Sequence, residues 1–279
     1  MLVFSTVQSI QSFLNTKYNN KKIGFVPTMG ALHKGHLSLV NRSSVENDIT
    51  VVSIFVNPLQ FNNKSDLLKY PRTPDTDLQK LRQTDCDVVF IPGYDDIYPG
   101  KINEHYDFGH LEQVMEGVAR KGHFNGVAIV VKRLFDIIKP HRAYFGEKDY
   151  QQLLIIKSLV VKENLPVEII PVEIVREPNG LAMSSRNELL TPKARGEAGV
   201  IYEVLLKTRE LFNKVSITEI KEYVKQQFNK KENFTLEYFE IADGHTLRIV
   251  TEKAPLQNVR AFIVVYVENV RLIDNISLT

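Results

Sequence analysis

Short apolar runs alternate with amphipathic stretches along the first part of the chain. Helical spacing of the apolar positions predicts helices after His36, around Leu67 to Leu81, over 124–138 and over 149–161. The sequence Thr73-Pro74-Asp75 adds a capping residue and a proline suited to a helix start. Runs rich in β-branched residues predict buried strands over 23–26, 49–56, 87–91, 143–145 and 167–170. Strands that alternate with helices indicate a parallel sheet with helices on both faces.

The pattern changes after the turn at 176–180. The remaining chain predicts two helices, then three strands that would pair as an antiparallel sheet: 192–212 and 217–228, then 235–241, 261–267 and 270–275. We therefore predict an α/β fold with two domains. Residues 1–175 would form a Rossmann-like, doubly wound parallel sheet, and residues 176–279 a smaller C-terminal α+β domain.

Composition narrows the class of protein. The 279 residues are 43% hydrophobic and 24% charged, typical of globular proteins, and the net charge of +2 gives no reason to expect nucleic acid as a partner. We expect no membrane partner, because no run approaches the roughly 18 apolar residues that a membrane helix needs. We expect no signal peptide and a cytoplasmic location. Cys86 is the only cysteine and is better explained as a small buried residue than as a nucleophile.

Polar or glycine-rich segments follow four of the apolar runs. They come after Val26, Val56, Phe145 and Val175. Parallel sheets bind their ligands outside the carboxyl ends of their strands, so we expect these segments to meet at one site. That shared placement is stronger evidence for a site than any single motif.

The first of these segments points to phosphate chemistry. Gly30 and Gly35 let a ligand approach the backbone, and His33 and His36 share one face of a helix start. A helix start offers free N–H groups and a positive dipole end, which suits a phosphate. The alternative is structural, with one histidine capping the helix and the other packed. A metal site is less favoured, because no third ligand lies at a suitable spacing.

The second and third segments each have an ordinary structural explanation as well. Asn57 and Gln60 offer amides that can bind a polar organic substrate, although Asn57-Pro58 is also a common turn. Lys148 can neutralise a polyphosphate and Asp149 can bind a ribose, although the pair can also be solvated at a helix start.

In the fourth segment, Ser184, Ser185 and Arg186 form a possible phosphate clamp, since arginine binds phosphate through two hydrogen bonds. A simple helix cap is the alternative. Paired histidines at a helix start and a distant Ser-Ser-Arg loop resemble the HIGH-type and KMSKS-type motifs of nucleotidyltransferases and class I aminoacyl-tRNA synthetases.

Six strings follow one another along the chain: PTMGALHKGH, FVNPLQF, YPRTPDTDL, GHFNGVAIVVKRLF, YFGEKDYQQL and GLAMSSRN. In this order they closely resemble one family of that superfamily, the pantothenate synthetases (pantoate–β-alanine ligases). The resemblance runs from about Lys22 to Leu190 and continues loosely to the end.

The resemblance implies a reaction. The family uses ATP to join pantoate to β-alanine, through a pantoyl adenylate, and releases pyrophosphate and AMP. Mg²⁺ is expected with ATP. A homodimer is also implied.

The resemblance also implies roles for individual residues. His36 would donate a proton, as an imidazolium, with His33 beside it, and Lys148, Ser184, Ser185 and Arg186 would act on the phosphates. Gln60 and Gln152 would bind pantoate, with Asn57, Tyr70, Arg120 and His123 as further contributors and Gln60 also meeting β-alanine. ATP would lie against Met29, Gly30, Ala31, Leu32, His33, Lys34, Gly35, His36, Gly146, Glu147, Lys148, Asp149, Val175, Met183, Ser184, Ser185 and Arg186.

The chain departs from the family at several positions. Ala182 stands where KMSKS begins with lysine, so Lys148 and the Ser-Ser-Arg loop would share that role. Thr76 interrupts an acidic run that can help bind Mg²⁺, which leaves Asp77 as the candidate ligand. Pro178-Asn179 precedes Gly180 where the family often has a charged residue and Asp, and Asn125 replaces a charged residue.

Two other functions remain open from the residues alone. A nucleotidyltransferase would keep AMP or CMP in its product, and release of free AMP would distinguish the ligase from it. A nucleotide-sensing protein would bind without turnover, but the chain carries both histidines, Lys148 and the Ser-Ser-Arg loop, which favours an enzyme.

Overall fold

A computed structural model describes residues 1–18, 20–252 and 258–279. Its larger sheet has six parallel strands in the order β1-β4-β3-β2-β5-β6. These strands are β1 (Leu2–Phe4), β2 (Ile23–Thr28), β3 (Ile49–Ile54), β4 (Val88–Phe90), β5 (Arg142–Gly146) and β6 (Glu168–Val172). The four central strands carry nearly continuous apolar runs, because each side of a covered parallel sheet needs its own buried residues.

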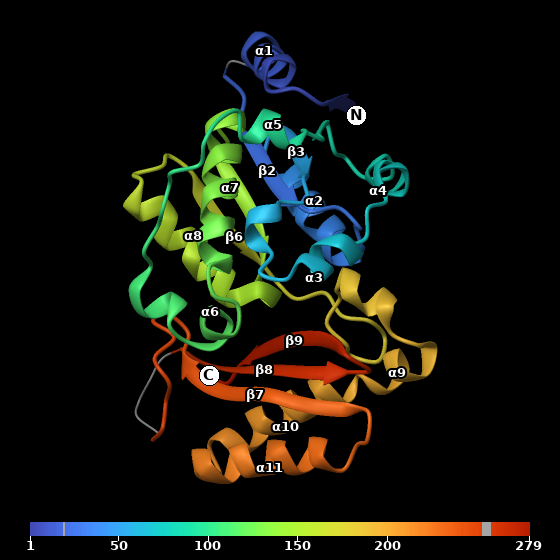
Figure 1. Ribbon diagram of the computed structural model, residues 1–279, viewed down its shortest axis with the longest axis vertical. Helices are drawn as coiled ribbons and strands as arrows, with labels where there is room; N and C mark the ends of the chain where they lie inside the picture. The colour runs from blue at the N-terminus through green and yellow to red at the C-terminus, as the bar shows by residue number, and fades with distance from the viewer. Residues whose placement is uncertain (19, 253–257) are drawn as a thin grey trace.

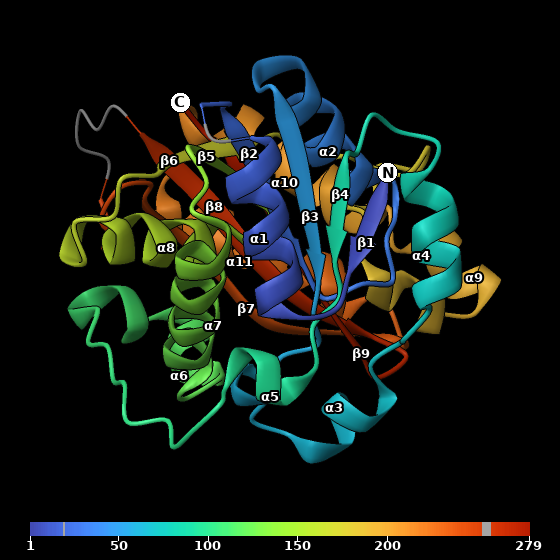
Figure 2. The same ribbon diagram turned by 90° about the horizontal axis from the view of Figure 1, so that it is seen from above.

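Helices cover both faces of this sheet. Phe25 faces a core formed with α1, α7 and α8, whereas its neighbour Val26 faces a second core formed with α2 and α4. Figure 2 shows α1, α7 and α8 on one side of the sheet and α2 on the other. The helices of this part are α1 (Val7–Lys17), α2 (Lys34–Glu46), α3 (Lys64–Lys69), α4 (Pro74–Leu81), α5 (Tyr94–Ile97), α6 (Met115–Ala119), α7 (His123–Ile138) and α8 (Tyr150–Lys162).

Three short 3₁₀ turns lie near the carboxyl ends of the strands or between helices. They are η1 (Pro58–Gln60), η2 (Gly109–Glu112) and η3 (Glu147–Asp149). Of these, η1 and η3 carry the predicted site residues Gln60 and Lys148.

The rest of the chain packs around its own apolar core. An antiparallel sheet in the order β7-β8-β9 is backed by α10 and α11 (Figure 1). Its elements are η4 (Ser185–Leu189), α9 (Pro192–Glu197), α10 (Val200–Phe212), α11 (Ile217–Asn229), β7 (Phe234–Asp243), β8 (Val259–Val267) and β9 (Val270–Ser277). The sheet lies across the end of the larger part where β2 and β5 finish, so the two parts enclose that edge (Figure 1).

The predicted fold class is confirmed, and the differences are local. The element pair β1 and α1 was not predicted, since β1 has only three residues. The predicted helix over 192–212 is two helices, α9 and α10, which meet at Gly199. A Cβ at Gly199 would lie 2.3 Å from the carbonyl oxygen of Asn179, so close backbone packing requires glycine there.

Within the described residues, no helix is both long and apolar enough to cross a membrane.

Candidate active site

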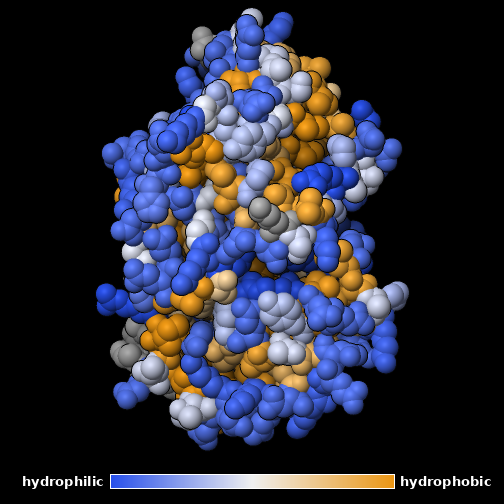
Figure 3. Space-filling view, viewed as in Figure 1, coloured by the Kyte–Doolittle hydropathy of each residue, from blue (hydrophilic) through white to orange (hydrophobic). Residues whose placement is uncertain are grey.

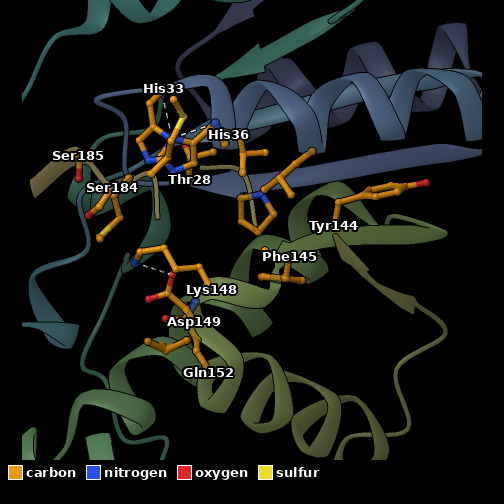
Figure 4. Close-up of a pocket in the computed structure, with 18 of the residues that line it drawn as sticks. Thr28, His33, His36, Tyr144, Phe145, Lys148, Asp149, Gln152, Ser184 and Ser185 are labelled. Carbon is orange, nitrogen blue, oxygen red and sulfur yellow. Dashed lines mark hydrogen bonds and ion pairs between the residues drawn. The ribbon is translucent and has the colours of Figure 1, made fainter. Parts of the chain in front are cut away.

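A cavity of about 220 Å³ lies at the carboxyl ends of β2 and β5 and brings the four predicted segments together. The surface is hollowed between the two parts of the molecule, with mostly hydrophilic side chains along the rim (Figure 3). The predicted residues that line the cavity are Met29, His33, Gly35, His36, Gln60, Tyr70, Gly146, Lys148, Asp149, Gln152, Val175, Met183, Ser184, Ser185 and Arg186. Figure 4 shows His33 and His36 across the cavity from Lys148, Asp149 and Gln152.

Both histidines cap helix α2 with one ring nitrogen. The Nδ1 atom of His33 accepts from the Gly35 N–H at 3.1 Å, and Nδ1 of His36 accepts from the His33 N–H at 3.3 Å. The ring centroids are 4.0 Å apart. Since each neutral ring uses Nδ1 as an acceptor, its proton is on Nε2, which is then the free donor. The capping and the ligand-binding explanations are therefore compatible.

The environment keeps both imidazoles neutral. Burial, followed by the nearby Lys148 ammonium, lowers the pKa of His33 to about 4. Burial, followed by His33, lowers the pKa of His36 well below 6.5. At neutral pH both rings therefore present neutral N–H donors, and an imidazolium at His36 is not favoured.

The low pKa values of two histidines predict acid sensitivity of the fold. His33 and His123 each have a pKa of about 4 in the folded chain against 6.5 in an ordinary environment. Below pH 6.5 the unfolded chain binds protons that the folded chain does not, so the free energy of unfolding falls as the pH drops towards 4. Each imidazole contributes up to about 3 kcal/mol to this loss.

Urea unfolding at pH 7, 6, 5 and 4 measures that loss. His123→Gln removes one titrating ring, so its free energy of unfolding should fall less steeply with acid than that of the unmodified chain. An equal slope in the two proteins would show that His123 is not protonated on unfolding.

Lys148 and Arg186 bring positive charge to the cavity from different parts of the chain. Lys148 lies on η3, its side chain is 17% exposed, and its ammonium is 3.5 Å from the Asp149 carboxylate. Arg186 comes from the loop before α9 and pairs with Asp66 of α3 at 3.1 Å. Burial raises the pKa of Asp149, but Lys148 and Arg186 outweigh it and leave that pKa below its ordinary value.

The Ser-Ser-Arg loop and the α3 segment meet beside the cavity. Besides the Arg186–Asp66 pair, the Tyr70 hydroxyl lies 3.5 Å from the Ser185 hydroxyl. The Ser184 hydroxyl accepts from the Arg186 N–H at 3.2 Å, which starts the turn η4. The capping explanation therefore holds for Ser184, and Arg186 still lines the cavity.

Gln60 is held by Asn57 and His123. Asn57 is fully buried and donates to the Gln60 side-chain oxygen at 3.2 Å and to the Gly126 carbonyl at 3.0 Å. His123 Nδ1 lies 2.7 Å from the Gln60 carbonyl oxygen and donates to it. A Cβ at Gly126 would lie 2.3 Å from the Leu59 carbonyl oxygen, so glycine lets α7 approach η1 closely.

Sequence reasoning missed an apolar wall of the same cavity. Four residues of α7 line it: Val127, Val130, Val131 and Leu134. Their spacing marked α7 as an apolar helix, but one with core residues alone. The sequence signal was the position of this apolar helix between two segments that carry predicted site residues, 57–60 and 146–152.

Several predicted site residues lie outside this cavity lining. Lys34 is exposed, Leu32 is buried in the core, and Glu147 pairs with Arg260 of β8 at 3.3 Å. Asn57 contacts Gln60 instead of the cavity, and Arg120 lines a neighbouring cavity of about 30 Å³. Gly30 and Ala31 form the turn beneath the histidines without lining the cavity.

Asp77 does not fit the expected role of a metal ligand. Its side chain is 1% exposed, and its two oxygens accept from the backbone N–H groups of Ala31 and Leu32 at 2.9 and 2.7 Å. Ala31 adopts a positive φ of 50°, a strained backbone conformation for a residue other than glycine. The carboxylate therefore stabilises the turn that leads into the two histidines.

The interpretation of Cys86 agrees with its surroundings. The side chain is 5% exposed, and burial raises the pKa of the thiol to about 12. A thiol with such a pKa is a poor nucleophile at neutral pH.

Comparisons with known proteins agree on one family. The family model for pantoate-beta-alanine ligase matches residues 2–277. A pantothenate synthetase of Azobacteroides pseudotrichonymphae is 53% identical over 279 residues, covering 99% of this chain and 100% of its own. A pantothenate synthetase of Flavobacterium psychrophilum is 48% identical over 281 residues, covering 100% of both.

Solved structures give the same result. The crystal structure of pantothenate synthetase from Thermus thermophilus superposes with a TM-score of 0.93 at 39% identity, covering 100% of this chain and 99% of its own. Pantoate-beta-alanine ligase from Francisella tularensis, in complex with beta-gamma ATP and beta-alanine, superposes with a TM-score of 0.83 at 37% identity. It covers 100% of this chain and 98% of its own.

Proposed function

The chain belongs to the pantoate–β-alanine ligase family, and on that premise we propose how its residues divide the work of the reaction. The chain condenses pantoate with β-alanine in an ATP-dependent reaction that passes through a pantoyl adenylate. One observation carries the assignment of residues: the paired histidines, Lys148, the Ser-Ser-Arg loop and two glutamines surround one cavity.

In the first step a pantoate carboxylate oxygen attacks the α-phosphorus of ATP. The bond between this phosphorus and the oxygen that bridges to the β-phosphate breaks, and pyrophosphate leaves. Negative charge builds up on the phosphate oxygens in the transition state. Lys148 and Arg186 offset this charge, and the Nε2–H groups of His33 and His36 donate to the oxygens. Ser184, Ser185 and Met183 close over the nucleotide, while Gly146, Asp149 and Val175 border its nucleoside.

Gln60 and Gln152 are the proposed contacts to pantoate. Their amides can both donate to the carboxylate or hydroxyls and accept from the hydroxyls. The apolar wall of α7 suits the two methyl groups of pantoate. Asn57 and His123 hold Gln60, Tyr70 also lines the main cavity, and Arg120 faces the adjoining cavity.

In the second step the β-alanine amine attacks the acyl carbon of the adenylate. The bond between the acyl carbon and the phosphate oxygen breaks, AMP leaves, and the attacking amine loses a proton. We propose that this carbon lies beside Gln60, which lines the cavity and would also meet β-alanine.

Mg²⁺ is proposed to enter with ATP as part of the substrate. Among the described residues no group of three or more His, Cys, Asp or Glu is arranged to hold a metal, and Asp77 is engaged by the backbone. The side chains present therefore do not fit a metal site built by the protein, and no step is assigned to the ion.

We further propose a domain boundary between Val175 and Arg176, which gives domains 1–175 and 176–279. In its support, the apolar core of the C-terminal part takes its residues from Leu181 onwards. A homodimer and a cytoplasmic location are proposed from the family resemblance.

Exchange of labelled pyrophosphate into ATP tests the reaction and its order. With pantoate present and β-alanine absent, we expect rapid exchange, because the adenylate forms before the amine is needed. Reactions without pantoate serve as the control and should show none.

Adding β-alanine should then release one AMP for each pantothenate formed. A product that keeps AMP or CMP would indicate the nucleotidyltransferase instead, and exchange that required β-alanine would exclude a free adenylate.

A further inference from the structure

Two consecutive buried residues of β9, Asp274 and Asn275, reach from the C-terminal sheet to the larger part of the molecule. Asp274 is 4% exposed and Asn275 is 2% exposed. Neither lines the main cavity, and neither belongs to a motif that the sequence singles out. Each one, however, contacts a segment that carries site residues.

Asn275 holds the backbone of η3. Its side-chain nitrogen donates to the carbonyl oxygens of Glu147 at 2.9 Å and Lys148 at 3.0 Å, which lie more than a hundred residues earlier in the chain. Its side-chain oxygen accepts from the Arg260 guanidinium, which can only donate. The arginine therefore fixes the orientation of the amide, and both of its N–H groups are committed to η3.

Arg260 is itself locked in place. Its guanidinium lies 4.0 Å from the centre of the Tyr150 ring and also pairs with Glu147 at 3.3 Å. Tyr150 directly follows η3 as the first residue of α8. The Asn275 amide therefore faces η3 beside an arginine that Tyr150 and Glu147 already hold in place.

Asp274, the residue before Asn275, anchors the same part of β9. Its carboxylate binds Arg176 through two hydrogen bonds, at 2.6 and 3.0 Å, and Arg176 also donates to the Gly180 carbonyl at 3.1 Å. The turn at 176–180 leads into Met183 and the Ser-Ser-Arg loop. β9 is therefore tied to both sides of the cavity next to Asn275.

We propose that Asn275 is a positioning residue for the adenylation step, acting through the backbone of Lys148. The proposal rests on the phosphate role proposed above for Lys148. The Lys148 side chain starts from a short turn with no side-chain cap, so its direction depends on what holds the turn. Asn275 supplies two hydrogen bonds from a rigid strand, and a displaced lysine would lose alignment with the phosphate.

The test is a double-mutant cycle read by pyrophosphate–ATP exchange in the presence of pantoate. Asn275→Ala should lower the exchange rate roughly tenfold to a hundredfold, with little change in the KM for pantoate. In a Lys148→Ala background the same substitution should have almost no further effect, because the residue through which it acts is gone. A merely structural role would instead lower the rate by the same factor in both backgrounds.

Asn275→Asp is the second variant. It keeps the shape and the oxygen that accepts from Arg260, but it replaces both donors to η3 with a carboxylate oxygen facing two carbonyl groups. It should therefore slow exchange at least as much as Asn275→Ala. The double-mutant cycle uses the Asn275 variant whose melting temperature is closer to that of the unmodified chain.

Arg271→Gln is the matched control. Arg271 also lies on β9 and joins the two parts through Glu116, with N–O distances of 2.7 Å, but it contacts no residue of the main cavity. It should lower the melting temperature and leave the exchange rate within about twofold, since surface or remote substitutions act mainly on stability.

Three results would overturn the proposal: undiminished exchange in both Asn275 variants, equal losses with and without Lys148, or an equal loss in Arg271→Gln. If Lys148→Ala alone leaves exchange intact, the phosphate role of Lys148 has failed, and the inference about Asn275 falls with it. The single lysine variant therefore separates the two failures.

Discussion

Lys148→Ala is expected to slow formation of pantoyl adenylate by about 10²–10³-fold, the usual cost of removing one preorganised group that stabilises developing charge. The ammonium lies in the cavity opposite the histidines, and it is one of the groups that lower the pKa of His33 and His36. In the resting protein its nearest anionic partner is Asp149 at 3.5 Å, a long contact that a phosphate can replace. Rapid-quench measurement of adenylate formation from ATP and pantoate gives the rate of this step directly.

Lys157→Ala provides a control on α8, the helix that directly follows η3. Lys157 is an exposed residue of α8 and does not line the cavity, so its removal should leave the rate unchanged. Supplying preformed pantoyl adenylate with β-alanine isolates the second step. A Lys148 variant that forms the adenylate normally and fails only in this second step would contradict its proposed role on the phosphates.

The sequence was sufficient to predict where the cavity lies, because local patterns determine strands and their ends. Val26 and Phe145 lie near the ends of strands that are apolar on both faces, and such strands have to be covered by helices on both sides. Their neighbouring carboxyl ends then bring Lys148 to the histidines. The helix start at Lys34 could likewise be predicted, since glycines and polar residues interrupt the apolar pattern just before it.

Contacts between residues far apart in the chain could not be predicted from local sequence patterns. Asp77 looked like a metal ligand in an acidic run, yet its carboxylate holds a turn that lies 45 and 46 residues earlier in the chain. Asn57 looked like a substrate ligand, yet it is buried, donates to the Gly126 carbonyl 69 residues later in the chain, and holds Gln60. In both cases the side chain has the chemistry that was expected, but the fold supplies a partner from the protein itself.

The interpretation of the histidines changed for the same reason. Their spacing indicated two ligands on one helix face, but the charge of each ring depends on burial and on Lys148, more than a hundred residues away. The neutral Nε2–H form is then the form that we expect to donate to the phosphate, and kinetic measurements can test this expectation.

His36→Ala is expected to lower kcat/KM for ATP by about 10²-fold, because it removes one N–H donor to the phosphate. Since kcat/KM reports ionisation of the free enzyme, and burial keeps the pKa of His36 well below 6.5, the loss should be constant between pH 6 and 8. The measurement is kcat/KM against pH for both proteins at saturating pantoate. His105→Ala, at an exposed position outside the cavity, is the control and should leave the profile unchanged.

An acting imidazolium would give a different result. Above its pKa the protonated fraction of His36 falls tenfold for each pH unit, so the ratio of the two kcat/KM values would shrink towards high pH by that factor. A constant ratio supports the neutral donor, and a ratio that changes with this slope excludes it. Equal kcat/KM values at every pH would remove His36 from the adenylation step altogether and leave it only as the cap of α2.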